Sequence, residues 1–345
     1  MPELPEVQTV VSDLNKKIKG DTITGFWSDW PKAIKNLTLE KFKKLIIGRK
    51  ILGARRLGKN LFIDLSGGKT LYIHLKMTGH LLVKAQANFQ FPISNFQSIS
   101  NDKISNSKKH DYFADKVNSY IHHIWYLTDS KLRMKCESTK ENSNGRVRSA
   151  QFACKTLEFS DVRKFAKIVL DDTEKIKNLK EIKALGVDAM SPEFTFKKFE
   201  EILGYPHPLP RRQAGSPLPK RARGIFNKPI GIVLMDQSLI AGIGNIYRSE
   251  ILYDAGIDPR RLVIEIRDRE IKELYKSIKK ILKKAIKMRG TSDSDYRDTA
   301  GAPGNFHKIL KVYKKAGQKC QRCDTIIKRI TMAQRSVFYC SSCQK

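Results

Sequence analysis

The chain ends in two Cys-x-x-Cys pairs, and this spacing constrains the fold more than any other feature. The pairs are Cys320/Cys323 and Cys340/Cys343, with sixteen residues between them. Each pair offers two thiolates to one edge of a tetrahedron, and a hairpin between the pairs would bring all four sulfurs together. Four protein ligands leave no open coordination position. We therefore predict a C-terminal zinc ribbon that holds one structural Zn²⁺.

The hairpin expected between the pairs is basic, and so is the whole chain. Lys328, Arg329 and Arg335 fall on it, where a basic finger could enter a nucleic-acid groove. Over 345 residues, 66 Lys and Arg face 35 Asp and Glu, a formal net charge of +31. Because no amphipathic anchor or lipidation motif accompanies this charge, it favours nucleic acid over a membrane surface.

The chain lacks an apolar run long enough to span a membrane, and its start lacks the pattern of a secretory signal. Closely paired cysteines with metal-ligand spacing are typical of a reducing compartment. We therefore expect a cytoplasmic, nucleoid-associated protein without membrane contacts.

The first six residues, Met-Pro-Glu-Leu-Pro-Glu, carry a second chemical signal. Removal of Met1 would leave Pro2 with a free secondary amine, which can attack an electrophilic carbon and hold it as an iminium. Glu3 and Glu6 could move protons beside it. The alternative is a proline-stiffened helix start with acids at its positive end. The six residues alone do not decide between the two.

The first half predicts a β-sandwich or barrel with one flanking helix. Apolar residues recur at helical spacing from Leu4 to Ile18. Strand-like alternation and turns follow, and we expect strands at the ranges 22–27, 61–65, 71–75, 120–128, 131–135 and 150–159. Polar stretches at 85–119 and 137–149 read as insertions that form surface loops.

The second half predicts helices. Thr195–Leu203 and the basic stretch Asp268–Met288 show helical periodicity, and the proline-rich range 204–230 reads as a linker or a DNA-facing loop. We expect three domains, with the ranges 1–170, 171–312 and 313–345.

Three weaker motifs leave two interpretations open. Gly242 and Gly244 precede a helix near Asn245, which suits either a phosphate site or an ordinary capped turn. Phe165, between cations after a strand, is either a wedge between base pairs or a core residue. Lys59, in a turn before a strand, would be an exposed turn lysine if it had no function.

Together these segments resemble the formamidopyrimidine-DNA glycosylase/endonuclease VIII family in order and nearly end to end. The matching parts are Pro2–Val10, Gly58–Asn60, His74–Gly79, Asp161–Phe165, Asp236–Ala255, Gly290–Tyr296 and the zinc ribbon. The resemblance implies an α+β protein with an N-terminal β-sandwich, a helical domain containing a helix–two-turns–helix, and a C-terminal zinc finger.

The resemblance also assigns roles to residues. It implies that Pro2 attacks C1′ of a damaged nucleotide, that Glu3 acts as acid and base at the sugar, and that Glu6 supports Glu3. Lys59 resembles the catalytic-site lysine that contacts phosphate. The residues that match the family's hole-filling side chains are Met77, Arg163 and Phe165, and those that match its further phosphate contacts are Asn245 and Arg335.

Two positions depart from the family pattern. Lys164 follows Arg163 where a second arginine is frequent, and Gly231 stands where many members carry a lysine. Lys228 lies nearby but out of register, so that contact stays unassigned.

The function implied is excision of oxidised purines, such as 8-oxoguanine and formamidopyrimidines, from double-stranded DNA, followed by β,δ-elimination at the abasic site. The purine preference depends on the likeness of the 290–296 loop to the purine-type subgroup. The alternatives are an endonuclease VIII-like enzyme for oxidised pyrimidines and a non-catalytic lesion-binding protein, which would need neither Pro2 nor Glu3. We expect a monomer.

Overall fold

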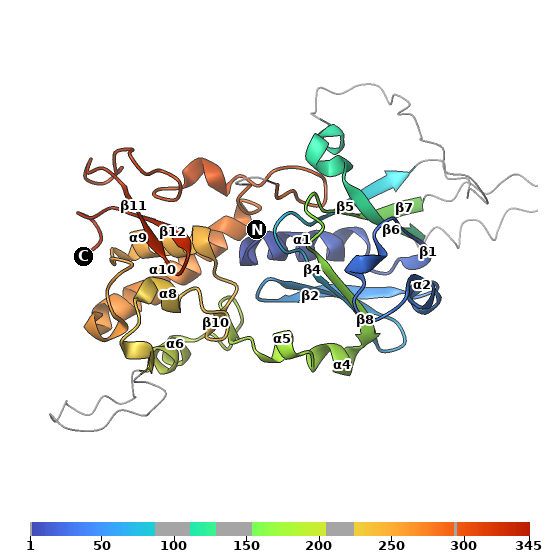
Figure 1. The fold of residues 1–345 in the computed structure, drawn as a ribbon, viewed down its shortest axis with the longest axis horizontal. Coiled ribbons are helices and arrows are strands. Elements are labelled where there is room, and N and C mark those ends of the chain that lie inside the picture. Colours follow the sequence, from blue (N-terminus) through green and yellow to red (C-terminus); the bar gives the residue numbers. More distant parts are fainter. Residues whose placement is uncertain (1, 87–110, 129–153, 205–223, 293–294) are drawn as a thin grey trace, which may run out of the picture.

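The computed structural model describes residues 2–86, 111–128, 154–204, 224–292 and 295–345. Two lobes are joined side by side, and the N-terminus lies where they meet (Figure 1). Among the described helices, none combines the length and the apolar composition required to cross a bilayer.

Within the described residues, the N-terminal lobe is a sandwich of two antiparallel four-stranded sheets. One sheet has the order β1-β6-β7-β5, with the bounds β1 Thr22–Ser28, β5 His80–Gln86, β6 Ile121–Thr128 and β7 Cys154–Ser160. The other has the order β2-β3-β4-β8, with the bounds β2 Ile51–Leu57, β3 Asn60–Leu65, β4 Lys69–His74 and β8 Lys167–Asp172. Their facing side chains form one apolar core, which includes Trp125, Phe159, Ile63 and Ile73.

Helix α1 (Leu4–Lys17) completes this core because its apolar residues lie on one face. Val7, Val10 and Leu14 pack into the sandwich. Leu4, by contrast, packs into the core of the other lobe. The first turn of α1 therefore lies at the junction of the two lobes.

The second lobe is helical and surrounds its own apolar core. Its α-helices are α4 Thr173–Lys177, α5 Lys180–Lys183, α6 Phe196–Leu203, α8 Ile230–Val233, α9 Asn245–Ala255 and α10 Asp268–Lys287, with α4 and α5 lying against the sandwich. A short parallel pair joins β9 (Val187–Asp188) to β10 (Ile240–Ala241). In this lobe, 3₁₀ turns occur at Val263–Glu265 and Phe306–Ile309, and in the sandwich lobe at Pro31–Ala33.

The tail forms the expected hairpin, β11 (Lys328–Met332) and β12 (Arg335–Tyr339), which packs against α9 (Figure 1). Ala333 and Gln334 both have positive φ, as a two-residue turn of this hand requires. The predicted fold class is confirmed: an α+β protein with a sandwich, a helical lobe and a ribbon. The domain boundaries at 170 and 312 stay predictions.

Most predicted elements are present, with bounds shifted by a few residues. The strand expected at 131–135, the insertion at 137–149 and most of the linker at 204–230 lie outside the described residues. The described end of the 85–119 insertion lies at the surface as predicted, because residues 111–119 are exposed or half-buried except for Asn118. It is nevertheless ordered into two 3₁₀ turns, Tyr112–Ala114 and Lys116–Ser119, and the buried Asn118 contacts the sandwich.

Candidate active site

The Glu3 side chain lies at the N-terminus of helix α9, on the opposite lobe. One of its carboxylate oxygens accepts from the Ile246 amide at 3.0 Å, and the other accepts from the Tyr247 amide at 3.4 Å. A helix N-terminus stabilises an anion through its free amides and its dipole. Glu3 is only 3% exposed. Pro2, which precedes it, is also buried.

Gly244 makes this contact possible. A Cβ at this position would lie 2.3 Å from the carboxyl carbon of Glu3, closer than any side chain permits. The sequence left two interpretations of this turn open, a phosphate site and an ordinary capped turn. In the structure, at least two amides of this helix end donate to Glu3.

Glu6 is the hub of a buried hydrogen-bond network. One of its oxygens accepts from the Glu3 amide at 2.7 Å, and the other accepts from the Tyr247 hydroxyl at 2.5 Å and the Thr291 amide at 2.7 Å. Burial, followed by the nearby charge of Glu3, raises the pKa of Glu6 to about 7. Glu6 thus connects α1, α9 and the 289–292 turn in one network. Sequence reasoning missed Tyr247 and Thr291, which are separated from Glu6 by more than 240 residues.

Lys59 lies in the same region, in the turn between β2 and β3. It is 8% exposed, so the interpretation as an exposed turn lysine is wrong. Burial lowers the pKa of its ammonium group, the nearby charges of Glu3 and Glu6 oppose that shift, and Arg335 adds to it. Lys59 also lines an open pocket beside the junction, together with Tyr72, His74, Lys76, Lys167 and Glu181.

The preceding residue, Gly58, fixes this turn to the helical lobe. Its amide donates to a carboxylate oxygen of Asp188 at 2.7 Å, and the Arg56 guanidinium pairs with the same oxygen. Asp188 was not singled out from the sequence, because its partner lies 130 residues away.

The predicted wedge residues lie on two adjoining loops of the sandwich. Met77 and Phe165 are 39% and 57% exposed, and the Arg163 guanidinium lies 4.0 Å from the Met77 sulfur. Phe165 is therefore not a core residue. The loops are held from beneath by Asp161, whose carboxylate accepts from the Thr78 hydroxyl and from the Phe165 amide at 2.9 Å.

Asn245 and Arg335 are brought together by the hairpin. The side-chain nitrogen of Asn245 donates to the Ser336 carbonyl at 3.0 Å, next to Arg335, and the side-chain oxygen accepts from Arg248.

Arg248 is a buried guanidinium that also donates to the Gly231 carbonyl at 3.0 Å. Gly231 has no room for a side chain, because a Cβ there would lie 2.9 Å from the Pro259 carbonyl. Sequence reasoning missed Arg248.

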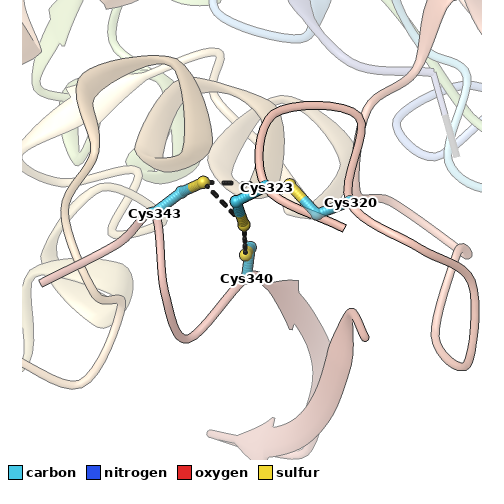
Figure 2. A group of neighbouring side chains, drawn as sticks. All are labelled: Cys320, Cys323, Cys340 and Cys343. Atoms are coloured by element: carbon cyan, nitrogen blue, oxygen red, sulfur yellow. Dashed lines mark hydrogen bonds between the residues drawn. The ribbon is translucent and has the colours of Figure 1, made fainter. Parts of the chain in front are cut away.

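The four cysteines converge at the base of the hairpin, as Figure 2 shows. Their sulfurs lie within 4.8 Å of one another, and the measured pairs are 3.3, 3.4 and 3.8 Å apart. A tetrahedral Zn²⁺ with Zn–S bonds of ~2.3 Å requires sulfurs about 3.8 Å apart. The donor set fits zinc and leaves no ligand position open. The predicted structural zinc site is confirmed.

Three family models cover most of the chain. The formamidopyrimidine-DNA glycosylase N-terminal domain matches residues 1–168, the formamidopyrimidine-DNA glycosylase H2TH domain matches 185–297, and a zinc finger found in FPG and IleRS matches 317–345. The formamidopyrimidine-DNA glycosylase of Carboxydothermus hydrogenoformans is 34% identical over the full length of both chains. The chain belongs to the formamidopyrimidine-DNA glycosylase family.

Other members agree with this assignment. The Pelotomaculum thermopropionicum formamidopyrimidine-DNA glycosylase is 35% identical, with 100% of this chain and 99% of that one covered. A structure of Lactococcus lactis Fpg with DNA containing an abasic site superposes with a TM-score of 0.70 at 28% identity, over 99% of each chain. A structure of MutM with DNA containing carbocyclic 8-oxo-G has the same TM-score and identity over 100% of each chain.

Proposed function

We propose that this protein is a bifunctional DNA glycosylase and AP lyase that removes oxidised purines from duplex DNA. The observation that carries the proposal is the Glu3 carboxylate, buried beside Pro2 and held by the amides of helix α9 at the lobe junction. A buried carboxylate next to a chain-terminal amine suits proton transfer at a reacting sugar better than it suits DNA binding alone.

Pro2 supplies the nucleophile once Met1 is removed. Its nitrogen forms a bond to C1′ while the bond from C1′ to the damaged base breaks and the base leaves with a proton. Opening of the sugar ring then gives an iminium between Pro2 and C1′. Because the iminium acidifies C2′, loss of a C2′ proton expels the 3′ phosphate, and a second elimination expels the 5′ phosphate.

Glu3 delivers and removes the protons in these steps. Its carboxylate is held in position at both oxygens, and it follows Pro2 directly in the chain. Glu6 supports it by accepting from the Glu3 amide and thereby orienting the first turn of α1. Lys59 is a buried cation whose pKa is lowered by burial, a shift that the charges of both acids oppose, and we assign it to the phosphate beside the lesion.

The wedge loops extrude the nucleotide. A base inside a duplex does not expose C1′, so the nucleotide must rotate out at a cost of a few kcal/mol. Exposed Met77, Arg163 and Phe165 offset part of this cost by filling the gap and contacting the orphaned base. Asn245 and Arg335 hold the phosphate backbone, and the net charge of +31 supports tight, salt-sensitive binding.

The zinc ribbon holds Arg335 in place through Cys320, Cys323, Cys340 and Cys343, and it has no direct part in the reaction. The proposed substrate also implies that the protein lies with the nucleoid in the cytoplasm.

Oxidised pyrimidines are the second candidate substrate. A superposable structure is described as wild-type Lactococcus lactis Fpg with DNA containing an oxidised pyrimidine, at a TM-score of 0.69 and 28% identity. The purine preference of this chain therefore needs its own test.

The test compares single-turnover base release and strand cleavage on duplexes that carry one 8-oxoguanine, one oxidised pyrimidine or no lesion. We expect cleavage of the 8-oxoguanine duplex, with phosphate at both ends of the gap. Faster cleavage of the pyrimidine duplex would favour the second candidate. The Glu3→Gln variant should bind the lesion duplex without releasing base, and unchanged turnover would remove Glu3 from the mechanism.

A further inference from the structure

Residues 111–120, the described end of the 85–119 insertion, lie between two parts of the proposed reaction machinery. On one side are the wedge loops, residues 76–79 and 161–166. On the other is the 295–304 segment, which leads back to Glu6 through a hydrogen bond from the Tyr296 hydroxyl to the Glu6 carbonyl at 3.4 Å. We propose that residues 111–120 form a brace that positions the wedge relative to the reaction centre. The proposal rests on the function proposed above.

The brace contacts one wedge loop and the strand that leads into it. The Asp161 amide donates to the Tyr120 carbonyl at 3.1 Å, and the hydroxyl of Ser160, the last residue of β7, donates to the Val117 carbonyl at 3.0 Å. Asp161 is the residue that orders Phe165, so the brace acts one step from the wedge itself.

Asn118 is the centre of the brace. Its side-chain nitrogen donates to the Tyr112 carbonyl at 2.6 Å and to the Gly301 carbonyl at 3.2 Å. Its oxygen lies 2.9 Å from Nε2 of His80, within hydrogen-bond distance. Asn118 and His80 are 1% and 0% exposed. Because both the oxygen and the nitrogen of the buried Asn118 side chain have hydrogen-bond partners, the network holds the neighbouring residues in one arrangement.

His80 continues the network toward Met77. Nδ1 of His80 lies 3.2 Å from the carbonyl of Thr78, and a neutral ring can donate either to this carbonyl or to Asn118, but not to both. The buried ring thus lies in contact with both residues, and the Thr78 hydroxyl donates to Asp161. The brace therefore reaches both wedge loops.

The contact with the 295–304 segment is close and specific. Gly301 has φ +77°, and a Cβ there would lie 2.8 Å from the Asn118 nitrogen and 3.2 Å from the Tyr112 carbonyl. An ion pair of 3.8 Å also joins Arg297 to Asp115. The backbone of the 295–304 segment thus packs directly against the brace. Displacement of the brace would therefore displace this segment, which is bonded to Glu6 through Tyr296.

The arrangement gives the brace a mechanical role. Insertion of Phe165 into the duplex exerts a force on the loop that carries it. Because the brace holds this loop in place, the distance between the wedge and the reaction centre stays fixed during insertion. Without the brace, the wedge would enter the duplex with C1′ less accurately placed. A misplacement of about 1 Å can lower the rate of reaction by about 100-fold.

The test is a double-mutant cycle between Asn118→Asp and Phe165→Ala, read as single-turnover base release from an 8-oxoguanine duplex. Asn118→Asp keeps the oxygen that faces His80 and replaces the nitrogen that donates to Gly301 and Tyr112. We expect Asn118→Asp to slow base release about tenfold. We also expect Phe165→Ala to cost about tenfold in the wild-type background and about threefold or less in the Asn118→Asp background, because coupled positions are not additive.

Asn15→Asp is the matched control. Asn15 also donates a side-chain N–H to a backbone carbonyl, that of Ala54 at 2.7 Å, but this bond and the one from the Ala54 amide to the Asn15 oxygen join α1 to β2 and not to a wedge loop or the brace. The fold-losses in base-release rate caused by Asn15→Asp and by Phe165→Ala should therefore multiply in the double variant. If Asn118→Asp does not fold, Ser160→Ala takes its place in the cycle, since it removes only the hydroxyl bonded to Val117.

Fully multiplicative losses, or no loss on Asn118→Asp, would overturn the brace. A wild-type chain that releases no oxidised base would instead contradict the proposed function, and this inference with it. A working wild type with multiplicative losses contradicts the brace alone.

Discussion

The carboxylate of Glu3 occupies the space that a side chain at position 244 would fill. An ideal Cβ on Gly244 would lie 2.3 Å from the Glu3 carboxyl carbon and 2.4 Å from one of its oxygens. Glu3, the proposed acid–base residue, can therefore reach helix α9 only because residue 244 has no side chain. The proposed reaction centre thus lies at the junction of the two lobes.

Gly244→Ala should displace the Glu3 carboxylate from helix α9 and slow base release at least about tenfold, because catalytic groups tolerate little misplacement. Single-turnover rates measure this loss. Gly224→Ala is the control, because a Cβ at Gly224 meets nothing within 4 Å. Equal rates for the two variants would show that the contact between Glu3 and α9 is not needed.

The pKa of Glu6, raised to about 7 by burial and by Glu3, predicts a pH-dependent stability. Between the ordinary value of 4.5 and about 7, the folded chain holds a proton that the unfolded chain has lost. The free energy of unfolding should therefore fall as pH rises through this range, by up to about 3 kcal/mol.

Glu6→Gln should remove this contribution, because an amide does not titrate. Denaturant unfolding of both proteins between pH 4.5 and 7.5 measures the difference, and the titration of all other groups cancels in the comparison. Parallel stability curves would contradict the raised pKa.

Zinc removal should unfold the ribbon and weaken DNA binding, because ribbon folding is coupled to metal binding. A chelator titration with fluorescence-anisotropy measurement of DNA affinity tests this, and zinc addition should restore affinity. Arg335→Gln is the companion variant, which should lose affinity while retaining zinc. Full affinity in the metal-free protein would contradict the role given to the hairpin.

Phe165→Ala should leave folding stability within about 0.5 kcal/mol, because exposed side chains contribute little to it. It should nevertheless slow base release, since Phe165 is 57% exposed and available for insertion. Phe159→Ala makes the contrast: this ring is fully buried in the sandwich core, so its removal should cost about 3–5 kcal/mol of stability. A loss of about 3–5 kcal/mol in Phe165→Ala would show that Phe165 is a core residue and not an exposed one.

Much of the fold could be predicted from local sequence patterns. The apolar repeat of α1 and the Cys-x-x-Cys spacing each depend on residues close in the chain, and both elements are present as expected. The burial of Lys59 was not predictable in this way. Ala241, from the other lobe, lies so close that a Cβ on the neighbouring Gly58 would be 3.1 Å from it.

The same limit applies to the anion at helix α9. The sequence around Asn245 suggested a phosphate site as one of two interpretations, but it could not show that the Ile246 and Tyr247 amides donate to a carboxylate 243 and 244 residues earlier in the chain. Arg248 and Asn118 were missed for a similar reason. Each is a buried polar residue whose partners become visible only once distant elements are packed together.

The central claim is that the amine of Pro2 is the nucleophile, and borohydride trapping tests it most directly. Purified protein is mixed with a duplex that carries one 8-oxoguanine, reduced, digested and examined by mass spectrometry of the N-terminal peptide. We predict a reduced sugar adduct on Pro2, with Met1 absent. An adduct on a lysine such as Lys59, or base release with no trapped adduct, would contradict the account.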